Sequence, residues 1–343
     1  MILSDYRIWD FKCKTRSLGL FKGTAAWAFD IMARHFQNDR YSKPVHKIYM
    51  KWLQKEYWDT GLYNTNAANE ITFGENIKSD KTDVWIFWYQ GWNTDNAPHY
   101  VKNCLFQGWE KKSAPQVVKD CRISTDKFLN PEKYNIHRLD KDNYSQYVKF
   151  PDWIMEKVKS GTINRIKFSN LLRLALLYRY GGIWMDATIF LTEPLDEKIT
   201  DYRYFSIKTP PAKPNFWISF DWTTYFLATN MCKTKFFKEL LTLQMEYWRR
   251  EDYVMDYLLL DYLIALIHSN EADIAEEWSK IPENNIDNLL IEHSVNETFD
   301  PGKWEEVSKR TGIFKVSYKI PPSDDPNTYY NKVVKSVVNS KKN

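Results

Sequence analysis

The sequence has few cysteines and no long apolar run. Its four cysteines are scattered and form no CxxC pair, so neither a disulfide framework nor a cysteine-bound zinc is expected. No apolar run reaches about 18 residues without a charge, and the first residues lack the basic region and apolar core of a signal peptide. We therefore predict a cytoplasmic protein without a transmembrane helix.

The motifs of several enzyme classes are also missing. None of the six histidines forms an HxxxH pair, and there is no glycine-rich P-loop and no G-x-S-x-G. A histidine-bound metal, a P-loop nucleotide site and an α/β-hydrolase serine are therefore not expected. The net charge is only +4, far from the charge of a strong nucleic-acid binder, so we predict no nucleic-acid partner.

What is present is the composition of a globular chain rich in aromatic side chains. The 343 residues are 43% hydrophobic and 16% aromatic, which is enough apolar material for a sizeable core. The runs "VWIFWYQGW" and "YNIHRLD" are typical of buried strands, and helical segments alternate with them. This alternation predicts an α/β fold with a mostly parallel sheet, in which ligands bind beyond the carboxyl ends of the strands.

The chain divides into three predicted regions. We expect an N-terminal helical extension over residues 1–80, the α/β domain over 81–320 and a C-terminal tail over 321–343. Late in the α/β domain, two helices are expected near 233–249 and 253–268. The tail combines four valines with lysines. It could form an amphipathic helix in peripheral contact with an anionic membrane, or it could be disordered.

One carboxylate stands inside an apolar strand, in the stretch "YRYGGIWMDATIF". The preceding segment predicts a buried helix that Ser169 or Asn170 caps and Gly181 ends. A buried aspartate has a large desolvation cost unless a cation or a metal matches its charge. Asp186 is therefore either a matched group of this kind or a strand-end residue that caps a turn with Thr188.

Three stretches together resemble a known family. They are "WIFWYQGWNTDNAPHYV", "FSNLLRLALLYRYGGIWMDATIFLTEPL" and "EYWRREDYVMDYLLLDYLI". In this order they resemble the capsular polysaccharide synthesis family of sugar transferases, which is related to the DxD-type glycosyltransferases. The resemblance covers residues 84–268. It implies a glycosyltransferase-A-like fold and a nucleotide-sugar donor.

The resemblance implies a metal-bound diphosphate next to Asp186. Asp186 would bind a divalent Mn²⁺ or Mg²⁺ on the donor, and Arg173 would help to hold the negative charge there. Gly182 would let the strand approach the nucleotide. Lys315 either reaches a phosphate or lies on a solvated strand, and the solvated strand is the favoured reading. One departure bears on the metal: Thr188 stands where D-x-D has its second carboxylate. The protein would therefore supply less charge to a metal than the family pattern does.

Further residues receive roles from the same resemblance. Gln90, Gly91 and Asn143 would contact the base or ribose of a uridine-type nucleotide, although ordinary turn chemistry explains them equally well. Asn170 replaces the family's aspartate and would hydrogen-bond a sugar hydroxyl. Asp256 would lie near the anomeric carbon or the acceptor. The alternative for Asp256 is a solvated helix face.

These implications predict a hexosyltransferase. It would move a hexose from a UDP-hexose donor to a surface or capsular polysaccharide, or to a lipid-linked glycan, with retention of the anomeric configuration. The alternative is a catalytically weakened relative that acts as a glycan-binding or scaffold protein, because Asn170 and Thr188 replace carboxylates.

Overall fold

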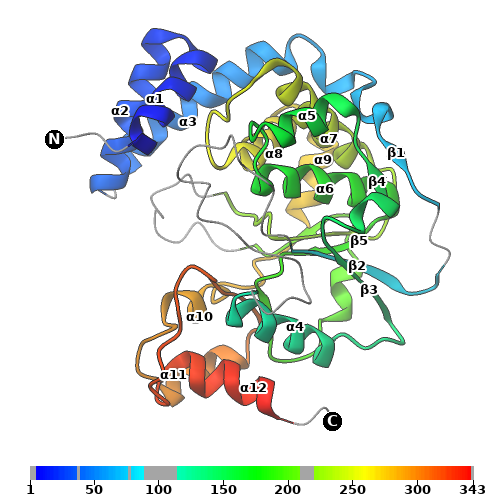
Figure 1. Cartoon of the computed structure of the whole chain (residues 1–343), viewed down its shortest axis with the longest axis vertical. Coiled ribbons are helices and arrows are strands. Elements are labelled where there is room, and N and C mark those ends of the chain that lie inside the picture. Colours follow the sequence, from blue (N-terminus) through cyan, green and yellow to red (C-terminus); the bar gives the residue numbers. More distant parts are fainter. Residues whose placement is uncertain (1–4, 37–38, 76–78, 89–113, 209–219, 341–343) are drawn as a thin grey trace.

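The centre of the computed structural model is a five-stranded sheet. The structure describes residues 5–36, 39–75, 79–88, 114–208 and 220–340. The strand order of the central sheet is β3-β2-β5-β8-β7 (Figure 1), with the bounds β2 (Thr82–Phe87), β3 (Tyr134–Leu139), β5 (Gly182–Met185), β7 (Phe205–Ser206) and β8 (Phe226–Thr229). β3, β2 and β5 are parallel, and β8 runs antiparallel to both of its neighbours. All strands of this sheet except β8 therefore point the same way, which confirms the predicted α/β class.

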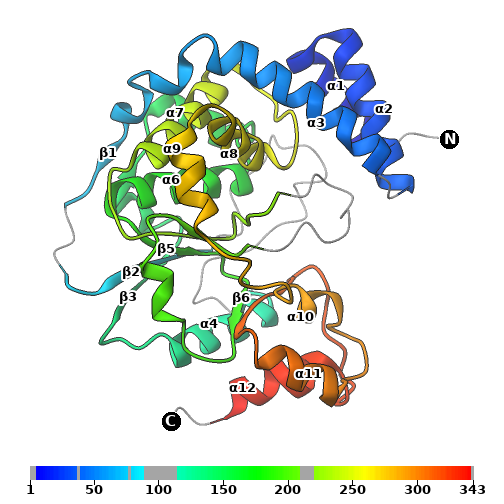
Figure 2. The same ribbon diagram turned by 180° about the vertical axis from the view of Figure 1, so that it is seen from behind.

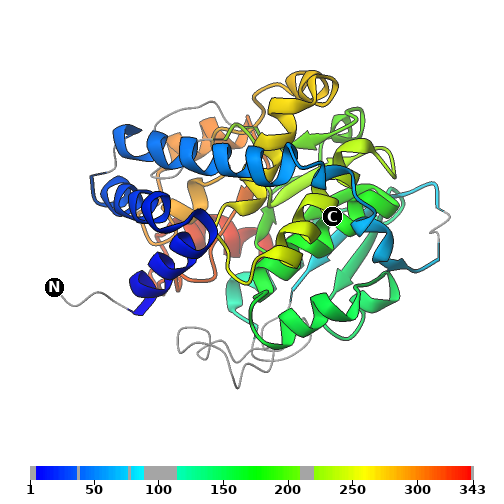
Figure 3. The same cartoon turned by 90° about the horizontal axis from the view of Figure 1, so that it is seen from above.

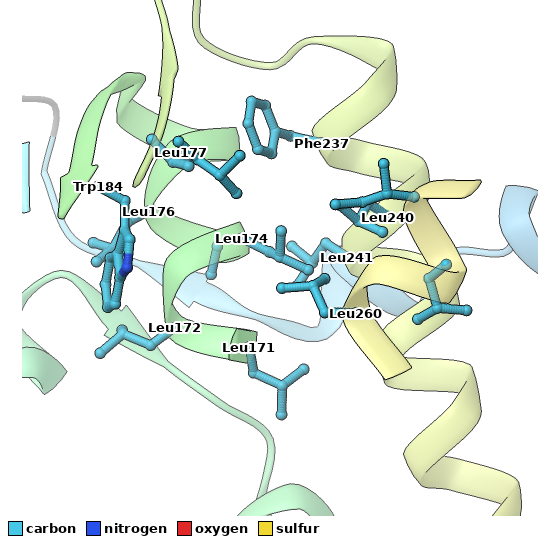
Figure 4. Packing of buried hydrophobic residues seen from close by; sticks show 14 of the residues in the cluster. Leu171, Leu172, Leu174, Leu176, Leu177, Trp184, Phe237, Leu240, Leu241 and Leu260 are labelled. Atoms are coloured by element: carbon cyan, nitrogen blue, oxygen red, sulfur yellow. The ribbon is translucent and has the colours of Figure 1, made fainter. Parts of the chain in front are cut away.

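A buried helix, α6 (Arg165–Tyr180), covers one face of this sheet. Its leucines pack against α7 (Lys235–Arg250), α8 (Leu259–Asn270) and the indole of Trp184 (Figure 4). The side chain of Asn164 caps the helix by accepting hydrogen bonds from the backbone N–H groups of Ile166 and Lys167. The predicted caps, Ser169 and Asn170, are therefore wrong, because both residues lie inside a helix that has already begun.

Two glycines join this helix to the strand that follows. Gly181 ends α6 with a φ of 72°, as predicted, and Gly182 begins β5 with a φ of 84°. A Cβ on Gly182 would lie 2.2 Å from the backbone oxygen of Asp83 on β2. The glycine therefore lets two strands approach each other at the start of β5, whereas Asp186 follows the other end. The predicted role of Gly182 at a nucleotide is corrected accordingly.

A second apolar cluster lies below the sheet in Figure 1 and is seen from behind in Figure 2. It includes residues of α4 (Gln116–Phe128), α10 (Leu290–His293), α11 (Pro301–Ser308) and the antiparallel pair β6 (Ile189–Leu191) and β9 (Ile313–Lys315). The chain ends here in a π-helical turn, Tyr330–Val334, and in α12 (Lys335–Asn339). Val333 and Val334 are buried in this cluster. The predicted tail is therefore an ordered segment whose valines pack on the protein.

The N-terminal helices form a separate layer. These are α1 (Asp5–Leu18), α2 (Leu20–Phe36) and α3 (Asp39–Leu53), drawn in blue to one side of the sheet in Figure 3. The side chain of Lys14 is fully buried between them and lies 2.8 Å from a carboxylate oxygen of Asp10 and of Asp30. Farther along, β1 (Thr72–Phe73) pairs with β4 (Val148–Lys149). The last part of the region predicted as a helical extension is thus joined to the α/β body.

Short elements complete the described chain. They are the helical turns Gln54–Trp58, Leu62–Asn64, Ala67–Glu70, Tyr144–Gln146 and Glu197–Thr200, and the helices α5 (Asp152–Lys159) and α9 (Ala272–Ser279). In the part of the chain that the structure describes, no helix combines the length and the apolarity that crossing a membrane requires.

Candidate functional site

A cavity of about 240 Å³ opens beyond the carboxyl ends of β2 and β5. This is the edge at which open α/β sheets bind ligands. The described walls come from six parts of the chain: the end of β2, α6, the segment after β5, the loop before α8, α10, and the segment that starts with β9. Gln90 and Gly91, predicted to contact the nucleotide, lie outside the described residues.

Asp186 lies in this cavity, and its contacts show how its charge is matched in an apolar strand. One carboxylate oxygen, Oδ1, accepts hydrogen bonds from Arg173 Nη2 at 2.9 Å and from Trp184 Nε1 at 3.0 Å. The other, Oδ2, accepts from Lys315 Nζ at 3.1 Å. Its charge is therefore matched by two cationic side chains, which is the first of the two readings that the sequence left open.

These two cations decide the charge of Asp186. Burial raises the pKa of the Asp186 carboxyl, but attraction from Lys315 and Arg173 outweighs burial and holds this pKa below its ordinary value. Arg173 is itself buried, with 5% of its side chain exposed, and its guanidinium lies over the Trp184 ring at 4.9 Å. Burial lowers the pKa of Arg173, and Asp186 opposes that change. We therefore expect an ionised carboxylate at neutral pH.

Strand pairing brings Lys315 to this carboxylate from 129 residues away. In the β6–β9 pair, Lys315 stands opposite Ile189, which places its ammonium next to the Thr188 hydroxyl. The ammonium also lies 5.2 Å from the centre of the Tyr225 ring. Sequence resemblance suggested Lys315 as a phosphate ligand, and the structure places it in the cavity with Arg173 and Asp186.

The cavity carries more positive than negative side chains. Four basic and two acidic residues line its described part: Arg165, Arg173, Lys315, Lys319, Asp186 and Glu292. Because Asp186 is already neutralised by its two partners, the remaining positive charge favours an anionic ligand. A diphosphate carries the charge and the acceptor oxygens that such a cavity would bind.

Asp256 lies beside the cavity rather than in its wall. It belongs to the loop before α8 and not to a helix, because α8 begins only at Leu259. Its Oδ1 accepts a hydrogen bond from the backbone N–H of Leu258 at 2.8 Å. Burial raises the pKa of Asp256, and Lys14 is the largest influence against that rise. The neighbouring Tyr257 lines the cavity instead, with 59% of its surface exposed.

A buried lysine that sequence reasoning missed supports this loop. Lys167 of α6 donates hydrogen bonds to the backbone carbonyls of Tyr257 and Asp256, and its ammonium lies 5.1 Å from the centre of the Tyr257 ring. Burial lowers the pKa of Lys167 to about 8. Asp261, in the first turn of α8, is buried nearby, and burial raises its pKa to about 7. A lysine between Ile166 and Phe168, in a helix predicted to be buried, was the available signal.

Two predicted residues lie outside the cavity wall. Asn143 is committed to its own turn: its amide nitrogen donates to the carbonyl of Arg138, and its oxygen accepts from the backbone N–H of Asp140. This is the turn chemistry that the sequence left open for it. Asn170 is buried in α6 with 7% of its surface exposed, whereas its neighbour Ser169 lines the cavity.

A divalent metal fits the described residues poorly. Among them, no three His, Cys, Asp or Glu side chains stand close enough together to hold a metal ion. The oxygen donors next to the cavity cations are Asp186 and Thr188, and both contact the ammonium of Lys315. A divalent cation on a diphosphate takes one or two protein carboxylates, with phosphates and waters as its other ligands. The carboxylate next to the cavity cations, Asp186, already accepts hydrogen bonds from two cationic side chains.

A comparison of the sequence with protein-family models assigns the chain to a family. The sequence model of the capsular polysaccharide synthesis proteins matches residues 104–333, which include Arg173, Asp186 and Lys315. The chain belongs to the capsular polysaccharide synthesis protein family. The resemblance predicted from the three motif stretches is thereby confirmed.

Two weaker similarities accompany the family match. An O-glycosyltransferase, braB, of Annulohypoxylon truncatum is 30% identical over 129 residues, which are 35% of this chain and 26% of the relative. The match thus spans about a quarter of that protein's length. Among solved structures, the PaToxG glycosyltransferase is similar with a TM-score of 0.35 and 12% identity, over 68% of this chain and 83% of that one.

Proposed function

We propose that this member of the family is a glycosyltransferase that moves a hexose from a UDP-hexose donor to a polysaccharide acceptor. The observation that carries the proposal is the cavity beyond β5, where Arg173 and Lys315 converge on Asp186. Family membership and the name of the fungal relative, an O-glycosyltransferase, support the same reaction class.

The cavity cations would bind the donor diphosphate and stabilise it as it leaves. In the transfer, the bond from the anomeric carbon to the diphosphate oxygen breaks, and its electron pair leaves with the diphosphate. An acceptor hydroxyl oxygen bonds to the anomeric carbon, and its proton passes to the departing diphosphate in a retaining, front-face reaction. Positive groups held in place at the developing negative charge contribute most in a reaction of this type.

Asp256 has a positioning role in this proposal. It does not line the cavity, but it anchors the loop that presents Tyr257 to it. Lys167 fixes the same loop through two backbone carbonyls. Tyr257 would then face the sugar or the acceptor with an aromatic ring, a surface that suits the apolar faces of a hexose.

The acceptor we propose is a growing surface or capsular polysaccharide, or a lipid-linked glycan, as the family description suggests. A membrane contact through the C-terminal segment is not part of the proposal, because Val333 and Val334 of that segment are buried in the protein.

A second candidate function is glycan binding without transfer. It is favoured by the neutral Asn170 and Thr188, which stand where the family pattern has carboxylates. It predicts that oligosaccharides bind to the protein whereas nucleotide sugars do not.

The test is a panel of nucleotide sugars offered to the purified protein, with donor hydrolysis and thermal shift as readouts. The proposal expects one UDP-hexose to stabilise the protein and to be hydrolysed slowly. Arg173→Ala should abolish both effects, and Lys309→Ala, on the exposed surface, should preserve both. Oligosaccharide binding with no response to any donor would favour the second candidate.

A further inference from the structure

We infer that the site binds the donor diphosphate through Lys315 and Arg173, without a divalent metal. This inference rests on the proposed function and specifies how its site holds the donor. It starts from a disagreement: the sequence resemblance implies a metal on Asp186, whereas both oxygens of this carboxylate already accept hydrogen bonds from cationic side chains.

The ammonium of Lys315 contacts the two side-chain oxygens that would have to bind a metal. It contacts Oδ2 of Asp186 at 3.1 Å and the hydroxyl of Thr188. These are the first and third positions of the stretch that replaces D-x-D. A metal bound to both would have to displace the ammonium and would then stand next to Arg173, at a cost in charge repulsion.

The same two side chains have the donors that a diphosphate needs. A lysine ammonium has three N–H groups, and within the described part of the chain Asp186 and Thr188 take up two of them. Arg173 also lines the cavity, where its Nη2 donates to Asp186. Phosphate oxygens can accept from an ammonium and from a guanidinium in short, charge-assisted hydrogen bonds.

Asp186 has a different task in this arrangement from that of a metal ligand. Its carboxylate holds Arg173 and Lys315 apart at a fixed geometry and lowers their mutual repulsion. The positive charge at the leaving group then comes from the protein and is present before the donor binds, so no cation has to be recruited from solution.

Calorimetric titration with UDP, GDP and CDP tests this inference, first with EDTA and then with Mn²⁺. We expect one nucleotide, UDP by the proposed function, to bind with the same affinity under both conditions. Lys315→Met should weaken this binding about 10- to 100-fold, the loss expected for a hydrogen bond between charged groups. Lys309→Met, which removes a largely exposed lysine, is the matched control and should bind like the parent protein.

Two further readouts separate the possible failures. If binding requires Mn²⁺, or if Lys315→Met binds like the parent, the metal-free site is wrong while the proposed function stands. If none of the three nucleotides binds with or without metal, the proposed function itself fails. Because UDP itself binds Mn²⁺, the electron paramagnetic resonance signal of free Mn²⁺ is compared with and without protein at one UDP concentration. The signal should be the same in both samples, and a further loss on adding protein would contradict the inference even if Lys315→Met does not fold.

Discussion

Two regions of this molecule hold carboxylates whose pKa values are shifted, and the two shifts have opposite directions. At the end of β5, Asp186 receives hydrogen bonds from two cations, and its pKa is lowered. Around the start of α8, Asp256 and Asp261 are more deeply buried, with 7% and 8% of their surface exposed against 28% of the Asp186 side chain, and their pKa values are raised. Deeper burial contributes to the opposite shifts, and the neighbouring cations contribute as well.

The two regions also differ in the groups to which their cationic side chains donate hydrogen bonds. Lys14, the largest influence against the pKa rise of Asp256, is held by Asp10 and Asp30. Lys167 donates to backbone carbonyls of the loop. Arg173 and Lys315, in contrast, point their N–H groups at Asp186 itself. A direct hydrogen bond from a cation offsets desolvation, whereas a cation engaged elsewhere offsets it only in part.

The largest expected effect comes from breaking the Asp186 cluster at its buried member. Arg173→Ala leaves a carboxylate in a mostly apolar environment with one partner fewer. We expect the free energy of unfolding to fall by about 3–5 kcal/mol, as for other buried ion pairs that lose one partner. Urea unfolding measures this change. Arg173→Lys, which keeps the positive charge, should recover part of the loss, and equal losses in the two variants would contradict the charge argument.

The next effect follows from removing the second cation. Lys315→Met should lower the free energy of unfolding at neutral pH by about 1.5–3 kcal/mol. The folded-state pKa of Asp186 should also rise. Since a lowered aspartate pKa contributes stability that is present above about pH 4 and is lost as the pH falls through the folded pKa, this acid loss should be smaller in the variant and should end at a higher pH. The free energy of unfolding is measured from pH 2 to 6 in both proteins. The same decrease toward low pH in the variant and the parent would be evidence against the contact between Lys315 and Asp186.

The carboxylates near α8 should show the opposite pH dependence. The pKa of Asp261 is raised to about 7, so the stability linked to it is full below about pH 4 and is lost as the pH rises toward 7. Asp261→Asn removes this loss. The quantity to compare is the free energy of unfolding of the variant minus that of the parent. We expect this difference to be higher at pH 8 than at pH 4 by on the order of 1 kcal/mol. A difference that does not change between these two pH values would show that Asp261 is ionised without penalty.

The smallest expected effect is at an exposed ion pair, which sets the baseline for the others. Lys309 and Glu305 lie 2.7 Å apart with 68% and 71% of their side chains exposed. Lys309→Ala should change the free energy of unfolding by less than about 0.5 kcal/mol. A loss as large as that of Arg173→Ala in the same urea assay would mean that burial does not separate the two pairs.

Much of this comparison could be predicted from the sequence. The lone aspartate in an apolar strand marked the site, and motif resemblance placed Arg173 at its negative charge. Lys315 was named only as a possible phosphate ligand, with a solvated strand as the favoured alternative. The α/β class followed from the alternation of strands and helices. What the sequence could not supply was the pairing of β6 with β9, because a contact across 129 residues leaves no local pattern.

The region near α8 was harder to predict for a physical reason. The apolar spacing of "EDYVMDYLLLDYLI" continues through the loop, so periodicity places the start of the helix too early. In the structure the side chain of Asp256 binds the backbone N–H of Leu258, which competes with the helix at this point. The predicted role of Gly182 at a nucleotide was wrong, because a glycine with a positive φ can let two strands pack closely as well as let a ligand approach.

A crystal structure of the protein with UDP, grown with Mn²⁺ present, would show how the cavity holds the donor. We expect the diphosphate in the cavity beyond β5, within hydrogen-bond distance of Lys315 Nζ and of the Arg173 guanidinium, with no metal between the phosphates and Asp186. A metal coordinated by Asp186, or a diphosphate bound away from this cavity, would contradict this expectation.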